Sequence, residues 1–246
     1  LVNATRSAAR SRRLPPLLVF GLLGVILLIY FALPLTVFLG RTGSASIVEA
    51  FSQVANQAAI RNSLLTAPVA TAIATVLGVP LAYILARETF PGKRVIEALV
   101  VLPLVVPPVV GGAMLLSVVG RFTPIGATAA RVGLPLTDSL VGVVLAQTFV
   151  AAPFVVITAR AGFGAVDERL EQASRSLGYS PIATFRRVSL PLASQAIVAG
   201  VVLTFARAIG EFGATMMVAY NPRTMPTRIW VEFIASGIDA IVPLAE

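Results

Sequence analysis

The sequence is dominated by apolar runs that are long enough to cross a lipid bilayer. The first covers residues 14–39, about 26 residues or roughly 39 Å of helix, and a hydrocarbon core is about 30 Å thick. Similar runs cover residues 63–86, 98–119, 140–160 and 193–219. A helix satisfies its backbone hydrogen bonds internally in lipid, so the pattern predicts an all-α, polytopic transmembrane helical bundle with five visible spans.

Composition supports a membrane protein and excludes most enzymes. Charged residues make up 12% of the chain, against about 25% in a typical soluble domain. The chain has no His and no Cys, which excludes thiol nucleophiles, Ser-His triads and nearly all zinc or copper sites. It also lacks a P-loop pattern. We therefore predict a protein that is not an enzyme, with no catalytic residue, cofactor or metal, and any ATP that drives it is bound by another subunit.

The basic residues predict an orientation rather than a nucleic-acid partner. With a cytoplasmic N-terminus, the predicted inner segments hold twelve basic residues and the outer segments hold six, as the positive-inside rule requires. The inner set is Arg6, Arg10, Arg12, Arg13, Arg87, Lys93, Arg94, Arg160, Arg169, Arg175, Arg186 and Arg187, and the outer set is Arg41, Arg61, Arg121, Arg131, Arg223 and Arg228. The polar segment 161–192 is then cytoplasmic, while 40–62, with a short helix near 46–59, and 120–139 are external loops.

The cytoplasmic segment 161–192 reads as two short helices joined by a glycine turn. Asp167 is a predicted N-cap, Gly178 supplies a left-handed stop, and Ser180 followed by Pro181 restarts the helix. One face of the first helix carries apolar residues at 3.6-residue spacing, which indicates a partner groove. These residues are Val166, Leu170, Ala173 and Leu177.

The same segment resembles the E-A-A, x3, G, x9, I-x-L-P motif of ABC importer permeases, type I. Gln172, Ser174 and Val188 depart from the motif, and Glu171 takes the place of the missing acid one residue early. The resemblance implies a coupling helix that inserts into a cleft on a cytoplasmic ATPase subunit; the alternative is an interfacial amphipathic loop with no partner. The coupling residues that it implies are Glu168, Glu171, Gln172, Ala173, Ser174, Gly178, Leu190 and Pro191.

Two of the predicted spans carry features that point to a translocation pathway. The third span contains Pro107, Gly111 and Gly112, and interrupted helices occur at membrane depth only against protein or water. A kinked packing helix is the alternative reading. The fifth span contains Arg207 and Glu211, the only full charges placed at membrane depth, flanked by Gly210 and Gly213. This pair either faces a pore or gate, or fixes the contact between two permease copies.

The stretch around Arg207 resembles the A-R-x-x-G-E-F-G-A signature of the molybdate, tungstate and sulfate branch of these permeases, most closely the molybdate/tungstate permease. The resemblance implies a homodimeric pathway for an oxyanion in the cell (inner) membrane, two ATP-binding subunits and an extracytoplasmic oxyanion-binding protein. It also implies an anchor helix with an external loop at 1–61, a permease core at 62–246, and a sixth span missing from the C-terminus. A sulfate permease and an ion-driven secondary transporter are the alternatives.

Overall fold

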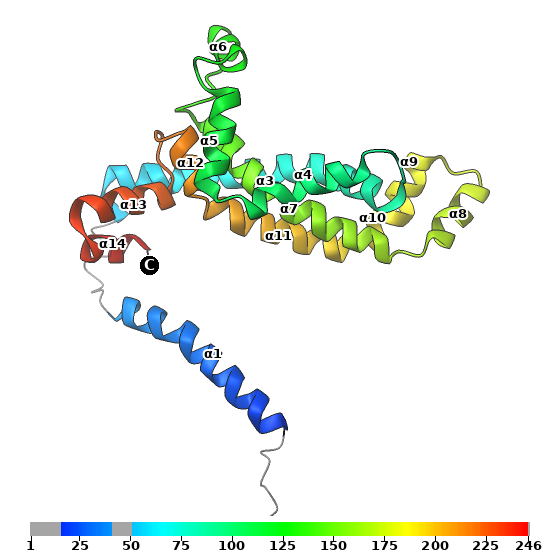
Figure 1. Cartoon of the computed structure of the whole chain (residues 1–246), viewed down its shortest axis with the longest axis horizontal. Coiled ribbons are helices and arrows are strands. Elements are labelled where there is room, and N and C mark those ends of the chain that lie inside the picture. The colour runs from blue at the N-terminus through cyan, green and yellow to red at the C-terminus, as the bar shows by residue number, and fades with distance from the viewer. Residues whose placement is uncertain (1–15, 41–50, 246) are drawn as a thin grey trace, which may run out of the picture.

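The computed structural model describes residues 16–40 and 51–245, which fold as helices without any strand in those ranges. Three long helices form the body of the bundle (Figure 1): α3 (Val54–Arg87), α7 (Leu140–Ala165) and α11 (Ser194–Ile209). Where they meet, Ala67, Ala70, Ala151 and Ala208 form a buried cluster. Small side chains let helix backbones approach closely, which is how membrane helices pack. The predicted all-α bundle is confirmed.

The second predicted span begins earlier than the sequence suggested. The helix α3 starts at Val54 rather than Ser63 and continues through residue 62 without a break, with Pro68 and Pro80 inside it. The separate short helix expected near residues 46–59 is therefore wrong in its second half, and residues 46–50 lie outside the described residues. The N-terminal arginines also lie outside them.

The third predicted span consists of two helices rather than one. The chain leaves α4 (Lys93–Val105) at Val106 and Pro107, both extended, and starts α5 (Pro108–Val119). Pro108 has no N–H to donate and is accommodated at the first position of the new helix. Figure 1 shows α5 standing across the bundle, with α6 (Pro124–Arg131) at its tip, inside the segment that was expected to be a loop.

The fifth predicted span is also broken, although it contains no proline. The helix α11 ends at Ile209, residues 210–212 are not helical, and α12 (Gly213–Val218) follows. The expectation of one continuous helix over residues 193–219 is wrong at this point.

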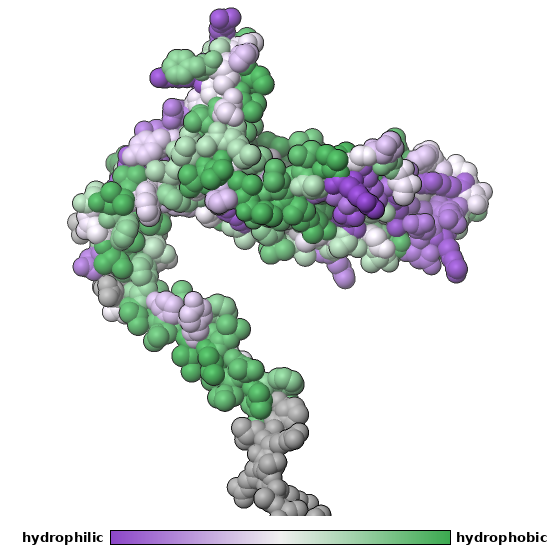
Figure 2. All heavy atoms as spheres, viewed as in Figure 1, coloured by the Kyte–Doolittle hydropathy of each residue, from purple (hydrophilic) through white to green (hydrophobic). Residues whose placement is uncertain are grey.

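The two ends of the bundle carry different elements (Figure 1). One end holds the short elements of segment 161–192: α8 (Glu168–Ser176), α9 (Pro181–Thr184), the π-helix η1 (Phe185–Ser189) and α10 (Leu190–Leu192). The other end holds α13 (Met225–Ser236) and α14 (Ile238–Ala245). Figure 2 shows hydrophilic residues gathered over the end that carries α8, and an apolar surface over the bundle between the ends.

Three described helices are long and apolar enough to cross a membrane, and up to five spans result if each of two bent helix pairs counts as one. The three are α1 (Pro16–Leu39), α3 and α7. The helix α1 lies apart from the bundle, and its apolar side chains from Leu17 to Leu39 face outward on all sides. A helix that is apolar all round is suited to lipid. The protein is accordingly a multi-pass membrane protein.

Candidate functional site

The helix α8 is built by the local signals that its sequence contains. Asp167 accepts a hydrogen bond from the backbone N–H of Arg169 at 2.9 Å, which caps the first turn. Gly178 has φ +89°, a left-handed conformation that glycine adopts without strain. Ser180 accepts from the N–H of Ala183 at 3.3 Å and begins α9. The predicted helix, turn and restart are all confirmed.

The apolar side chains of α8 and α9 point away from the bundle. Leu170 is 49% exposed, Leu177 is 79% exposed and Ile182 is 72% exposed, while Ala173 is also exposed. Of the predicted apolar stripe, only Val166, which precedes α8, is buried. We call Leu170, Ala173, Leu177 and Ile182 the outward patch. Apolar residues on an otherwise polar end of a protein mark a surface for another molecule.

The helix α8 leaves most of its polar residues exposed but turns two of them inward. Its buried residues are Glu171 and Ser174. The hydroxyl of Ser174 lies 3.0 Å from that of Thr184 in α9, which holds the two short helices together. Glu171 is 4% exposed and pairs with Arg87 of α3. Its carboxylate is turned into the bundle, and its part in docking stays a prediction.

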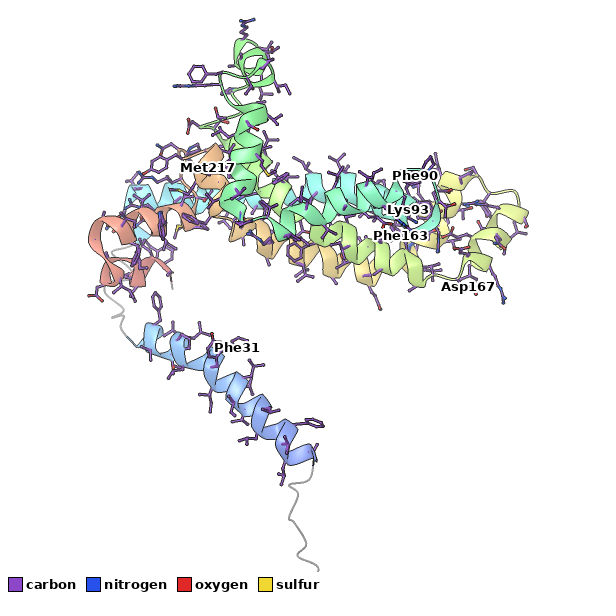
Figure 3. The ribbon with its side chains drawn as sticks, in the orientation of Figure 1. Phe31, Phe90, Lys93, Phe163, Asp167 and Met217 are labelled. Carbon is purple, nitrogen blue, oxygen red and sulfur yellow. The ribbon has the colours of Figure 1, made fainter. Side chains whose placement is uncertain are left out.

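Glu171 is held by three donor side chains from two elements, α3 and η1. Nε and Nη2 of Arg87 both lie 2.9 Å from its Oε1, Ser189 of η1 donates to the same oxygen at 2.8 Å, and the Tyr83 hydroxyl donates to Oε2 at 3.2 Å. Nη2 of Arg87 also donates to the carbonyl of Val166 at 2.9 Å. We call Tyr83, Arg87, Glu171 and Ser189 the anchor cluster. Figure 3 labels Phe163 and Asp167, which mark this end of the bundle.

The remaining coupling candidates lie around this core. Glu168 is largely exposed and its carboxylate approaches Arg87 at 3.7 Å. Gln172, Gly178 and Pro191 are exposed, and Leu190 is half-buried. The structure thus collects the predicted coupling residues at one end of the molecule, with Glu171 and Ser174 inside and the others on or near the surface.

The pathway candidates lie farther along the bundle, where the two broken spans meet. A Cβ on Gly112 of α5 would lie 2.7 Å from Cα of Ala214 in α12, and one on Gly213 would lie 3.0 Å from the backbone nitrogen of Val109. Gly111 is likewise buried, against Phe149. Pro107 is exposed at the break that precedes α5. Figure 3 labels Met217, which lies at this contact between α5 and α12.

Glu211 lies in the break of the fifth span and stabilises both sides of it. Its Oε1 accepts the N–H of Ala214 at 2.7 Å, near the start of α12, and its Oε2 lies 2.5 Å from Nη2 of Arg207 in α11. The predicted pairing is therefore confirmed, but Glu211 also serves the helix that follows. The Glu211 side chain is 1% exposed and that of Arg207 is 27% exposed, while Gly210 is open to the surface.

Sequence reasoning missed several polar residues that the structure buries. Tyr83, Arg87 and Ser189 gave no signal, because their partner is distant in the chain. Gln147 is fully buried in α7, and its side-chain amide has no hydrogen-bond partner among residues 16–40 and 51–245. An amide inside an otherwise apolar span is a signal that could have identified it. Among the described residues, no group of three or more Asp or Glu could hold a metal ion.

Comparisons with known proteins show the family to which the chain belongs. A family model described as the inner membrane component of binding-protein-dependent transport systems matches residues 78–243. A probable molybdenum ABC transporter permease of Haloferax volcanii is 51% identical over 224 residues, covering 91% of this chain and 82% of the relative. A molybdate/tungstate transport system permease of Thermococcus kodakarensis is 42% identical over 238 residues, covering 95% and 90%.

A solved structure shares the fold. It is a bacterial alginate ABC transporter in complex with a periplasmic protein bound to an alginate pentasaccharide, with a TM-score of 0.70 and 17% identity, covering 93% of this chain and 86% of the matched chain. At this identity the likeness supports the permease fold and carries no information on cargo.

Proposed function

Because the chain belongs to the family of inner membrane components of binding-protein-dependent transport systems, and is a permease subunit rather than a catalytic one, we propose that its cargo is molybdate or tungstate. The proposal is supported by the likeness to the probable molybdenum permease of Haloferax volcanii and the molybdate/tungstate permease of Thermococcus kodakarensis. The permease forms no bonds in this process. Its part is to open a path alternately to the two sides of the membrane.

The outward patch carries the proposal that ATPase subunits drive this permease. Leu170, Leu177 and Ile182 are exposed apolar side chains at this polar end, while the buried residues of α8 are Glu171 and Ser174. A groove on a cytoplasmic ATPase that receives α8 would cover them. Glu168, Gln172 and the other exposed coupling residues would then lie at the rim of the contact, where polar groups are tolerated.

Two copies of the permease would form one pathway, with one ATPase subunit on each and an extracytoplasmic binding protein delivering the oxyanion. The positive-inside distribution supports a cytoplasmic N-terminus and a cytoplasmic α8. Residues 62–246 would form the core and residues 1–61 the anchor and first external loop. Closure of the ATPase pair on ATP would move both α8 helices and turn the cavity from inward-facing to outward-facing.

The contact between the broken spans is the proposed wall of the pathway. Gly112 and Gly213 bring α5 and α12 together at backbone distance, so the two short helices can shift against each other with few side chains in the way. Pro107, Gly111 and Gly210 lie at or beside the two breaks. Arg207 is partly exposed next to this contact, and it would present positive charge to a passing anion while Glu211 limits how tightly the anion binds.

Uptake into proteoliposomes tests the function. The permease is purified with its ATPase subunits and binding protein, and radioactive molybdate accumulation is followed with ATP inside the vesicles, where the cytoplasmic side faces inward. We expect accumulation that stops without ATP or without the binding protein and that excess tungstate suppresses. Uptake that needs no ATPase but disappears with the ion gradient would establish a secondary transporter instead. Uptake of sulfate alone would refute the proposed cargo.

A further inference from the structure

The helix α8 depends on the anchor cluster for its position. It has nine residues, and isolated helices shorter than about 12 to 15 residues are marginal in water. Its connection to α7 is the extended pair Val166 and Asp167, and its connection to α9 passes through the left-handed Gly178. Neither connection is helical. The buried side chains Glu171 and Ser174 therefore decide how α8 sits on the bundle.

Glu171 and Ser174 lead to different parts of the molecule. Within the described ranges, the hydroxyl of Ser174 bonds to that of Thr184 in the neighbouring short helix α9. Glu171 bonds to Arg87 and Tyr83, which both belong to α3. Through Glu171, α8 is fastened to a helix of 34 residues that runs along the whole bundle.

The cluster is buried and its geometry is fixed on several sides. The side chains of Arg87 and Glu171 are 7% and 5% exposed, so neither charge can be satisfied by bulk water if the other is removed. The ring of Tyr83 packs edge-on against Phe163 of α7 and Phe185 of η1, with centroids 5.2 and 4.9 Å away. These rings hold the Tyr83 hydroxyl in place below the Glu171 carboxylate.

We propose that Arg87 is a positioning residue that makes α8 and α3 move as one body, so that a displacement of α8 reaches the membrane-spanning bundle. This inference rests on the proposed docking of an ATPase on α8. With the ion pair intact, force on the outward patch passes through Glu171 to the inner end of α3. Without it, α8 rotates at its two connections and the force is lost locally.

The geometry requires an arginine at position 87. Its guanidinium reaches the Glu171 carboxylate and the Val166 carbonyl together, and it approaches Glu168 at 3.7 Å. It thus fixes both the first turn of α8 and the chain that enters it. A lysine carries one compact charge and cannot place fixed donors in several directions at once.

The test compares Arg87→Gln, Arg87→Lys and Glu171→Gln in the complete complex with its ATPase subunits and binding protein. The measured quantity is the amount of molybdate taken up per ATP hydrolysed. We expect the ratio to fall about fivefold or more in Arg87→Gln and in Glu171→Gln. The double variant that combines these two substitutions should lose little more, because each single substitution already removes the same contact. Arg87→Lys is expected to fall between wild type and Arg87→Gln.

Arg160→Gln is the matched control, because Arg160 forms an ion pair with Glu97 at 2.8 Å between α7 and α4, outside the anchor cluster. Its ratio should remain within about twofold of wild type, as for sites that share no partner. Ser189→Ala and Tyr83→Phe each remove one donor and keep the ion pair, so they report on the cluster if the charge-removing variants do not assemble. For them we expect a loss of about two- to threefold.

The outcomes separate this inference from the proposed function. Suppose that the wild-type complex accumulates molybdate. If Arg87→Gln then takes up as much molybdate per ATP as the Arg160→Gln control, the positioning role is refuted and the function stands. If Arg87→Gln does not assemble, the same ratio in Ser189→Ala and Tyr83→Phe refutes the role in the same way. If the complex carries sulfate rather than molybdate, the cargo is wrong, and the same ratio measured with sulfate decides the role of Arg87. If no ATPase binds to the permease, both proposals fail together.

Discussion

Replacing Gly112 by alanine should damage the contact between the two broken spans. The added methyl would lie 2.7 Å from Cα and 2.9 Å from the carbonyl oxygen of Ala214, and 2.9 Å from Cβ of Met217. Two of these atoms are backbone and cannot rotate away, so α5 and α12 must separate. Overpacking of this kind costs about 1 to 3 kcal/mol, which corresponds to a fall in Tm of roughly 2 to 12 °C for a chain of this size.

Two other glycines provide a graded comparison. A methyl on Gly210 would lie 3.5 Å from the carbonyl oxygen of Ala206, and the backbone there has φ −87°, which alanine adopts freely. A methyl on Gly111 would lie 3.1 Å from Cε1 of Phe149, a ring that can move. The expected order of thermal stability is therefore Gly210→Ala at or above wild type, then Gly111→Ala, then Gly112→Ala.

The assay is thermal unfolding of the purified permease in detergent, followed by the fraction that remains monodisperse after heating. Molybdate uptake by the same variants shows whether the damage reaches transport, and we expect Gly112→Ala to transport least. Equal melting temperatures for Gly112→Ala and Gly210→Ala would refute the close approach of α5 and α12 on which the pathway proposal depends.

Three further predictions concern partners, charge and orientation. Ala173→Trp should reduce ATPase binding in co-purification by about tenfold or more, roughly 1.4 kcal/mol. The Tm of the isolated permease should stay within about 2 °C of wild type, because the side chain is exposed. Unaltered ATPase binding would contradict docking on the outward patch. Arg207→Gln leaves the buried Glu211 unpaired and should cost about 3 to 5 kcal/mol of stability, whereas Arg207→Lys should retain most of it; equal melting temperatures would show the pair to be dispensable. Because the chain has no cysteine, Ser176→Cys in sealed cells should resist an impermeant maleimide while Thr128→Cys reacts, and the reverse labelling would overturn the orientation.

Local signals predicted the elements whose stabilising groups are close in sequence. Asp167 and Ser180 cap the helices that they precede, and Gly178 ends α8, because each acts on backbone groups within three residues. The long helices α3 and α7 were also predicted from local signals, because each contains its own apolar run. A twenty-residue apolar run has few alternatives in a bilayer.

The site needed information that no local pattern contains. Arg87 and Glu171 are 84 residues apart, and nothing near Arg87 distinguishes it from a basic residue at the cytoplasmic end of a span. The break after Ile209 was missed because it contains no proline; the Glu211 carboxylate accepts the N–H of Ala214 and so makes the interruption tolerable. The face of α8 that turns outward was also undetermined, since it depends on Arg87.

The meeting of α5 and α12 has an electrical consequence. At 1.5 Å per residue, twelve residues of α5 and six of α12 extend about 18 and 9 Å, and a bilayer core is about 30 Å thick. A single continuous helix therefore cannot seal the membrane against ion leakage at this place. It depends on two short helices in close contact at Gly112 and Gly213, so we expect a substitution that separates them to let ions leak across the membrane as well as to reduce uptake.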